Sequence, residues 1–460
     1  MMTPTEYNPE LLVQWSIDSN HSPELNQSLA AYIQQFGHLF NSSQIKYFSA
    51  FLKGLFSSLE RKSLEPIALR FLGEKSVRSM QQFFSRAPLN LPEFMNTYHR
   101  LFSSQVAHPG GMLSVDDSSF IKKGIRSVGV ARQYCGRLGK KENCQVGVFL
   151  AYATELGYGL VDRELYIPQK WYEESYTKLC EECQLPKDKP FAMKNQIALK
   201  MLNQALKSGL FPVQWIGCDA AYGCDHSFID GLELPEGVCY FAATNAKEQI
   251  FRERPEIYPP EITGGKGRPP KHATYSTERT TVKQVAEDPD IPWETVVLME
   301  CSKGPIQAKR KITRCIASRK DGNRNYVKPG EDIWLYIRLY ENGDIKYFIS
   351  NAPAETSAGE LDRAATLRWP IEQCFEECKS NLGMSHYECR SYPGWMRHMS
   401  FVMAAHLFTL QVRIAVKKRN SPDNANDSPI NTGDHHIHST ICKKNYKLSY
   451  TTEPLRVSVA

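Results

Sequence analysis

The sequence has no stretch that is typical of a secretory signal or of a membrane-spanning helix. It starts with MMTPTEYNPELLVQW, in which no basic stretch precedes an apolar core. The most apolar late run, Phe401 to Leu410, is ten residues long and contains His406, so it is too short to cross a bilayer. We therefore expect a soluble, intracellular protein.

A disulfide framework and internal repeats are also missing. The 13 cysteines are odd in number and scattered, a pattern that favours reduced thiols. Cys180 and Cys183 have the spacing of a zinc-binding pair, but no second pair lies nearby, so we expect no zinc site. The segment 417–460 is polar and begins with a run rich in Asn, Asp, Ser and Pro, which predicts a disordered tail.

The sequence has little excess charge of either sign. The 56 Lys and Arg residues exceed the 50 Asp and Glu residues by only six. The excess is nevertheless local, because residues 264–325 hold thirteen Lys or Arg and seven Asp or Glu, which gives 13 − 7 = +6. The rest of the chain then sums to zero. A cationic segment of this kind indicates a polyanionic partner more strongly than an evenly spread surplus does.

What the chain does contain is enough apolar residues for two or three folded domains, with 460 residues and a hydrophobic fraction of 42%. Apolar residues recur at helical spacing in YIQQFGHLF and in IKYFSAFLKGLFSSLERK. These patterns predict an all-helical domain over 1–105. A loop with Pro109, Gly110 and Gly111 follows and marks a domain boundary.

After that loop the pattern changes to strands. The runs GMLSVDDSSF, QVGVFLAYAT and YGLVDRELYIP predict three consecutive strands. An amphipathic helix is expected at Lys194–Ser208, and VQWIGCDAAYG and VCYFAATN predict two further strands. This order predicts an α/β fold over 106–246, with a mixed sheet and flanking helices.

The segment 247–350 interrupts this alternation. Strand-like runs such as KITRCIASRK, IWLYIRLY and DIKYFISN are separated by the turn signals Asp321-Gly322 and Asn342-Gly343. We predict a β-rich, basic insertion here. Helical periodicity returns over 351–416, which we expect to complete the α/β domain.

Two acidic positions follow predicted strands. Asp116, with Asp117 beside it, ends one apolar run, and Asp219 ends another. Carboxylates held at neighbouring strand ends suit a divalent cation such as Mg²⁺, which completes its shell with water and substrate phosphate. Aspartate is also common after strands simply because it favours turns. Taken alone, these two residues favour the turn interpretation.

A third acidic position lies on a predicted helix from Pro370 to Leu382. Proline suits the first helical position, and Gly383 suits the end of a helix. Glu372, Glu376 and Lys379 form a polar stripe beside an apolar one. Alone, such a helix is typical of a solvated protein surface.

Three segments of the sequence together resemble a known family. They are SVDDSSFIKKGIRSVGVARQYCGRLGKKENCQVGVF, GCDAAYG and RWPIEQCFEECKSNLGMSHYECRSYPGWMRH. They are similar to the Asp-Asp-Glu (DDE) transposases of bacterial insertion sequences, and most similar to the insertion-sequence 701 family within the larger insertion-sequence 4 group. The resemblance extends from about Gly54 to Phe408.

The resemblance implies a ribonuclease-H-like fold with Asp116, Asp219 and Glu372 as catalytic residues and metal ligands. Asp117 is the alternative to Asp116, and the sequence leaves that choice open. Arg368, Glu372 and Lys379 fit the last three members of the larger group's Tyr-Arg-Glu-Lys signature. Its Tyr would fall at position 365, which is Ala365 here, so the contact usually given to that Tyr is in doubt.

The implied chemistry is phosphoryl transfer on DNA. Three carboxylates can hold two Mg²⁺ ions, or Mn²⁺ as a substitute, roughly 3.5–4 Å apart across a scissile phosphate. Arg368 and Lys379 would contact the DNA backbone. The implied partners are double-stranded DNA, as the element's terminal inverted repeats and as target DNA, and a second copy of the chain in a dimer on DNA. The implied location is the cytoplasm, at the nucleoid.

Further DNA contacts are expected from two basic clusters. KGRPPK, which supplies Lys266, Arg268 and Lys271, suits either minor-groove insertion or, more often, general phosphate contact. Lys122 and Lys123 are either DNA-facing or merely solvated. Two other functions remain open at this point: a non-catalytic DNA-binding repressor, against which the three filled acidic positions argue, and a metal-dependent nuclease without strand transfer.

Overall fold

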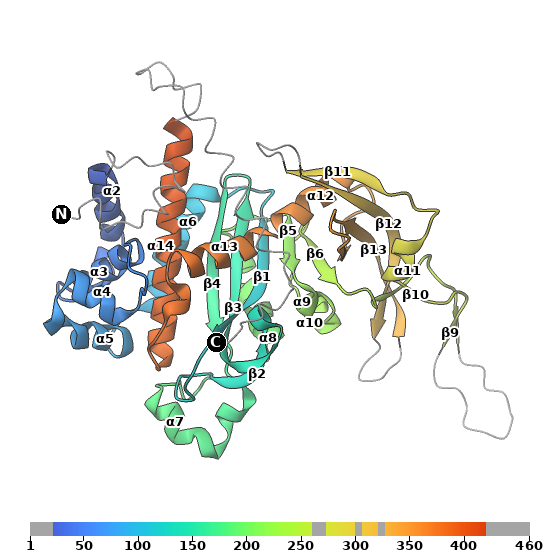
Figure 1. The fold of residues 1–460 in the computed structure, drawn as a ribbon. Coiled ribbons are helices and arrows are strands. Elements are labelled where there is room, and N and C mark those ends of the chain that lie inside the picture. Colours follow the sequence, from blue (N-terminus) through green and yellow to red (C-terminus); the bar gives the residue numbers. More distant parts are fainter. Residues whose placement is uncertain (1–21, 260–272, 300–305, 321–326, 420–460) are drawn as a thin grey trace, which may run out of the picture.

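The computed structural model describes residues 22–259, 273–299, 306–320 and 327–419. Helices gather at the N-terminal side, a ribonuclease-H-like sheet lies in the middle, and a β-rich part extends that sheet on the far side (Figure 1). The predicted fold class, a mixed sheet with flanking helices and an N-terminal helical region, is confirmed.

One long C-terminal helix, α14 (Tyr392–Arg419), lies between the N-terminal helices and the central sheet (Figure 1). Phe401 on α14 packs its ring against Phe48 and Phe94, with centroid separations of 4.9 and 5.2 Å. The guanidinium of Arg397 donates to the backbone carbonyl of Phe84 at 3.0 Å. Helix α14 therefore belongs to the same core as the N-terminal helices, which are α2 (Ser22–Gln34), α3 (Ile45–Leu55), α4 (Leu64–Phe71), α5 (Val77–Ser85) and α6 (Leu91–Val106).

Helix α14 is longer than the apolar run identified in the sequence. Its segment Tyr392–Val416 has the length and composition of a membrane-crossing helix, but 67% of its most apolar window is buried inside the protein. Its packing against the N-terminal helices accounts for that apolar composition. The helix also extends to Arg419, past the predicted start of the tail, and residues 420–460 lie outside the described residues.

The central sheet is built from five strands. β1 (Met112–Ile121), β3 (Lys140–Thr154) and β4 (Gly157–Leu165) are antiparallel neighbours. β5 (Trp215–Cys218) and β6 (Cys239–Thr244) continue the sheet parallel to β1. The resulting order β4-β3-β1-β5-β6 is the one expected for a ribonuclease-H-like sheet. All five strands were predicted from the sequence.

One strand of this part was not predicted. β2 (Ala131–Cys135) pairs antiparallel with the start of β3, beyond the end of β1. Its sequence ARQYC alternates buried and exposed residues but contains few residues typical of strands. The strand is therefore held mainly by pairing with the long, polar start of β3.

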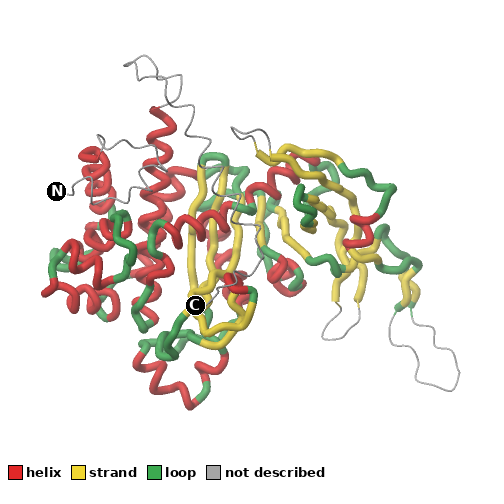
Figure 2. Tube along the Cα trace, in the orientation of Figure 1, coloured by secondary structure: helices red, strands yellow, loops and turns green. Residues whose placement is uncertain are grey.

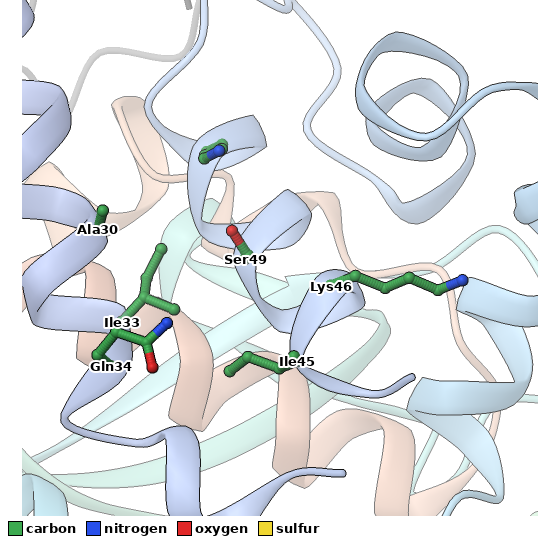
Figure 3. A pocket seen from close by; sticks show the side chains of 7 residues that line it. Ala30, Ile33, Gln34, Ile45, Lys46 and Ser49 are labelled. Carbon is green, nitrogen blue, oxygen red and sulfur yellow. The ribbon is translucent and has the colours of Figure 1, made fainter. Parts of the chain in front are cut away.

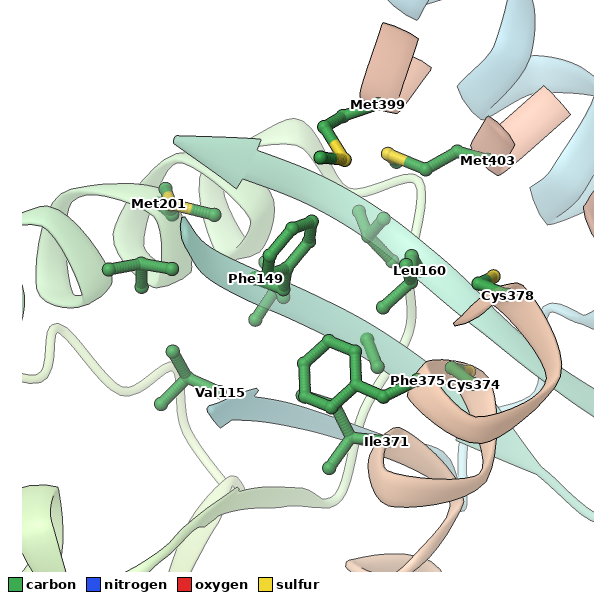
Figure 4. Close-up of a cluster of buried hydrophobic side chains, with 14 of the residues drawn as sticks. Val115, Phe149, Leu160, Met201, Ile371, Cys374, Phe375, Cys378, Met399 and Met403 are labelled. Carbon is green, nitrogen blue, oxygen red and sulfur yellow. The ribbon is translucent and has the colours of Figure 1, made fainter. Parts of the chain in front are cut away.

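Helices cover both faces of the central sheet. Helix α8 (Lys194–Ser208), predicted with these bounds, packs on β3 and β1. Helix α13 (Pro370–Ser380) packs on the other face, where Phe375 contacts Phe149 of β3 at a ring separation of 5.3 Å (Figure 4). Met201 of α8 belongs to the same buried cluster. The sheet thus separates α8 from α13.

The predicted β-rich insertion extends the central sheet, because its last strand, β14 (Ile345–Ser350), pairs with β6. The two longest strands, β12 (Ile306–Lys320) and β13 (Val327–Leu339), lie next in the sheet (Figure 2). α12 (Ala358–Leu367) then leads back to α13. The shorter elements are β7 (Gln249–Phe251), β8 (Ile257–Tyr258), β9 (Thr274–Tyr275), β10 (Thr280–Thr281), α11 (Val282–Glu287) and β11 (Glu294–Met299).

Candidate active site

The strand register brings two of the predicted carboxylates side by side. β1 and β5 run parallel, with Val115 opposite Cys218. Asp116 and Asp219 are the next residue in each segment. Asp219 directly follows β5, whereas Asp116 lies within β1, which continues to Ile121, so the expectation that Asp116 ends a strand was wrong. Because both residues are attached to buried strands, their positions are fixed by the sheet.

Asp219 is oriented by the backbone that follows it. It caps the short helix α9 (Ala220–Gly223), and its Oδ1 accepts hydrogen bonds from the backbone N–H groups of Ala221 and Tyr222 at 3.0 and 3.2 Å. Oδ1 of Asp116 accepts from the backbone N–H of Asp117 at 2.6 Å. In each aspartate one carboxylate oxygen is thus held by the backbone, which leaves Oδ2 without a backbone partner.

The third carboxylate comes from the first turn of α13. Pro370 occupies the first helical position, as predicted, and Glu372 follows in the same turn, where negative charge is favoured by the helix dipole. Arg368, at the end of α12, donates to Glu372 Oε1 at 2.8 Å. The side chain of Arg368 is 16% exposed and that of Glu372 is 43% exposed.

The three carboxylates share one electrostatic environment. Burial, together with the negative charges of Asp219 and Glu372, raises the pKa of Asp116 to about 8, against the opposing effect of Arg368. Burial also raises the pKa of Asp219. Placing several carboxylates within reach of one another is unfavourable unless a cation balances them. Arg368 supplies one such cation within the chain.

Asp116 and Asp117 point to opposite faces of the sheet, as successive strand residues must. Both carboxylate oxygens of Asp117 are engaged: Oδ2 accepts from the Lys194 ammonium of α8 at 2.5 Å, and Oδ1 accepts from the Tyr222 hydroxyl at 2.5 Å. Asp116 instead lies opposite Phe149, on the face that α13 covers. Asp116 is therefore the one of the pair that shares a face with α13.

The donor set suits a hard divalent cation, because it consists of carboxylate oxygens alone. Among the described residues, one oxygen each of Asp116, Asp219 and Glu372 has no hydrogen-bond partner. No group of three or more His, Cys, Asp or Glu within the described ranges is drawn together closely enough to form a ready metal centre.

The remaining predicted DNA contacts have different placements. The Lys379 ammonium lies 5.7 Å from the ring centroids of both Phe120 and Phe375. Burial lowers the pKa of Lys379, while the charge of Asp116 raises it, so this lysine lies within electrostatic reach of the carboxylates. Ala365, where the family's Tyr is missing, is buried in a second apolar cluster.

Lys122 does not face outward, whereas both alternatives left open by the sequence, a DNA-facing and a solvated lysine, place its ammonium outward. Its ammonium donates to the backbone carbonyl of Tyr387 at 2.5 Å and lies 4.7 Å from that ring's centroid. Burial lowers its pKa to about 8. The neighbouring Lys123 is exposed, so the two lysines have opposite environments. Lys266, Arg268 and Lys271 lie outside the described residues.

Two side chains next to the carboxylates were missed in the sequence. Lys194 and Tyr222 both hold Asp117. In the sequence, Lys194 is recognisable only as the start of a helix, and Tyr222 only as a residue that follows a strand. The alternation of strand residues shows that Asp116 and Asp117 face opposite ways, but not which helix each one meets. That information comes only from the packed structure.

The carboxylates do not line either of two shallow pockets found among the described residues. One of these pockets involves α2 and α3 (Figure 3). It is lined by Ala30, Ile33, Gln34, Ile45, Lys46, Ser49 and Lys53, none of which is acidic. Its lining offers no chemistry for a reaction, so the carboxylates remain the candidate site.

Comparison with known proteins gives a family. Among solved structures, the chain is similar to a piggyBac transposase synaptic complex with hairpin DNA, with a TM-score of 0.31 and 10% identity over 97% of this chain and 91% of the other. A similarity this low says nothing about the site. No curated protein matches the sequence. A family described as DDE superfamily endonuclease matches residues 34–305, which include both aspartates and end before Glu372. Because that match spans more than half of the 460 residues, the chain belongs to the DDE superfamily endonucleases.

Proposed function

We propose that this chain is a DNA transposase of the insertion-sequence 701 family, which cleaves the ends of its element and joins them to target DNA. The observation that carries the proposal is the strand register, which sets Asp116 and Asp219 side by side, with Glu372 close enough to raise the pKa of Asp116. The family is one of endonucleases. The three sequence segments that resemble insertion-sequence transposases include all three of these residues.

Asp116, Asp219 and Glu372 would hold the divalent metal, each through its unshared oxygen. Endonucleases of this superfamily generally use divalent metals, and we propose two Mg²⁺ ions. When bound, they would supply Lewis-acid activation of the attacking water or 3′-hydroxyl and stabilise the leaving oxygen. The backbone N–H groups that hold Asp219 and Asp116 fix the direction of both carboxylates before any metal or DNA arrives.

Arg368 has a second task in this proposal. Its guanidinium donates to Glu372 at 2.8 Å and balances the negative charge of that carboxylate. With DNA bound, the same guanidinium would contact a phosphate oxygen, and Glu372 would be among the residues that hold the metal. Lys379, two turns further along α13, adds positive charge near the same DNA strand.

The other parts of the chain have proposed roles as well. The N-terminal helices, predicted to form a domain over 1–105, would bind the element's ends. The segments 106–246 and 351–416 would form the catalytic domain, and 247–350 would be its basic insertion. We also propose that two copies act together, since two element ends must be cut, and that the protein works in the cytoplasm at the nucleoid.

A metal-dependent nuclease without strand transfer is the second candidate, favoured by the endonuclease description of the matched family. A non-catalytic repressor is the third, and the complete set of three carboxylates argues against it. Both differ from the transposase in what they do to DNA ends, so one reaction separates all three.

The experiment incubates the protein with Mg²⁺ and a duplex carrying the DNA that flanks its coding sequence, together with a target plasmid. A transposase yields cleaved ends and insertion products. Cleavage without insertion supports the nuclease. Binding of the ends without any cleavage contradicts both enzymes and supports the repressor.

A further inference from the structure

A second run of positive charge lies outside the insertion, immediately after β1. From residue 122 to residue 141 there are seven Lys or Arg and no Asp or Glu. This segment, which we call the basic hairpin, contains the loop after β1, the strand β2, a 3-10 turn at Gly136–Leu138 and the first residues of β3.

The cations of the basic hairpin are solvent-exposed with one exception, Lys122. Within the described residues, none of the exposed ones forms an ion pair. Glu142, directly after Lys141 on β3, is the nearest acidic residue in the sequence. Like charges gathered in such excess repel one another and lower the stability of the fold. An arrangement of this kind is balanced when a polyanion binds. The exposed cations are Lys123, Arg126, Arg132, Arg137, Lys140 and Lys141.

The backbone that carries these cations is held firmly. The buried amide of Gln145 donates to the carbonyl of Val128 at 2.6 Å, and the backbone N–H of Val128 donates to the carbonyl of Arg390 at 2.9 Å. The indole of the buried Trp171 donates to the carbonyl of Val130 at 3.0 Å. The cations thus extend from a fixed backbone, which favours contact with a regularly spaced partner.

Part of the basic hairpin faces the same side of the sheet as Asp116. On β3, alternate residues from Lys141 to Phe149 share a face, and Phe149 lies opposite Asp116. On β2, Tyr134 lies opposite Lys141, and Arg132 lies two residues before it on that face. The side chain of Tyr134 is 59% exposed.

The turn of the hairpin also approaches the candidate site. The 3-10 turn at Gly136–Leu138 contacts β1. Arg137 in this turn lies within electrostatic reach of Lys379, which in turn senses the charge of Asp116. The turn of the hairpin therefore lies beside β1, the strand that carries Asp116.

We propose that the basic hairpin binds the phosphate backbone of duplex DNA next to the scissile phosphate, through Arg132, Arg137 and Lys141. The inference rests on the proposed function for the position of the scissile phosphate, while binding by the hairpin can be tested separately. Its contacts are electrostatic and independent of base sequence.

The test compares DNA affinity over a range of salt concentrations, with a random-sequence duplex of about 40 base pairs as the probe. The triple variant Arg132→Ala, Arg137→Ala, Lys141→Ala should bind roughly tenfold or more weakly at about 0.1 M salt, since each lost phosphate contact lowers the log–log salt slope by about 0.9. The slope should therefore fall by about 2.7.

Two variants serve as controls. Lys187→Ala, Lys200→Ala, Lys207→Ala removes the same charge from exposed lysines, two of them on α8 on the opposite face, and should leave the slope unchanged. Arg132→Lys, Arg137→Lys keeps the charge and should retain most of the affinity. Circular dichroism and thermal melting of every variant check that each one folds.

Each outcome either supports or overturns the proposed contact between the hairpin and DNA. The proposed contact is overturned by an unchanged slope in the triple variant. It is also overturned by an equal fall in the control variant of Lys187, Lys200 and Lys207, even if wild type cleaves flanking DNA. A selective fall supports the contact even if wild type never cleaves, in which case only the proposed function fails. Wild type that does not bind the duplex at all overturns both.

Discussion

The insertion and the basic hairpin are both cationic, but their charges are used differently. In the insertion, Arg310 forms ion pairs with Glu294 and Asp362, and Arg319 forms an ion pair with Glu331. In the basic hairpin, no exposed cation has an acidic partner within the described residues. Among the described residues, the insertion therefore uses at least these two arginines for folding, whereas the exposed cations of the hairpin remain available for a ligand.

The difference shows how a net charge counted along the sequence can mislead. The surplus of +6 belongs to residues 264–325, yet Asp362 and Glu331, which neutralise two of its arginines, lie outside that range. Lys311 is buried and donates to the carbonyls of Ala286 and Asp288. DNA would meet fewer free cations on the insertion than the count suggests.

The largest expected effect is on DNA cleavage and comes from the carboxylates. Both cationic regions matter for the reaction only if these carboxylates are its site. Asp116→Asn should reduce cleavage to background, because the proposed metal loses a ligand. Asp117→Asn should retain cleavage, because that carboxylate is held by Lys194 and Tyr222 on the other face. Gel assays of end cleavage measure both, and the salt slope of DNA binding should be unchanged in each.

The melting temperature controls for misfolding in the Asp116 variant. Removing a buried carboxylate whose pKa is raised should leave the stability equal or higher. If Asp117→Asn abolished cleavage while Asp116→Asn retained it, the assignment of the first metal ligand would be reversed.

The second prediction tests whether the insertion's charge serves folding. Arg310→Ala leaves Asp362 and Glu294 without their guanidinium, and the side chains of Arg310 and Asp362 are only 16% and 22% exposed. We expect the free energy of unfolding to fall by about 2 kcal/mol, with no change in the salt slope of DNA binding. Urea denaturation measures the loss.

Lys309→Ala is the matched control, since Lys309 is exposed on the same strand. It removes the same charge and should change stability by less than about 0.5 kcal/mol. If Arg310→Ala left stability unchanged and lowered the salt slope, the insertion would resemble the hairpin and the contrast between the two regions would disappear.

A third prediction is that acidification lowers the stability of the insertion but does not change the charge of the hairpin. Although burial opposes it, the guanidinium of Arg319 holds the pKa of Glu331 below its usual range. A depressed pKa contributes stability that is present above the unfolded pKa, about 4.3, and is lost as the pH falls through the lower folded value. The insertion should therefore lose stability on acidification below about pH 4. The hairpin has no acidic residue, so its charge does not change there.

Thermal melts between about pH 2.5 and pH 6 measure this dependence. The variant Glu331→Gln should weaken it, while the hairpin variant Arg132→Ala, Arg137→Ala, Lys141→Ala should melt with the same pH profile as wild type. An unaltered profile in Glu331→Gln would assign the acid sensitivity to other carboxylates.

The sequence predicted those elements whose own patterns are strong. β1, β5 and α13 were expected because their apolar spacing and end signals agree with their burial. β2 was missed because its pairing with the polar start of β3 is a contact between segments, which no local pattern encodes.

The site was predictable as a set of residue types but not as a geometry. Neighbouring residues such as Lys122 and Lys123 look alike in sequence, yet one ammonium lies against Tyr387 and the other is exposed. Likewise, alternation separates Asp116 from Asp117 without saying which faces α13. The direction of a side chain and its ion pairs depend on packing between distant segments. That packing determines which positive charges remain available to DNA.

The smallest expected effect is also the most sensitive test of the contrast. Lys283 pairs with Glu287 one helical turn later on α11, and both side chains are more than 60% exposed (61% and 64%). A pair this exposed contributes little, so Lys283→Ala should change the free energy of unfolding by less than about 0.5 kcal/mol. If an acidic neighbour is enough to make a surface cation unavailable to DNA, the salt slope should also stay within error of wild type. A fall of about 0.9 in that slope would mean that DNA displaces Glu287 and takes the lysine. In that case pairing would not distinguish the two regions, and only the buried arginines of the insertion would be withheld from DNA.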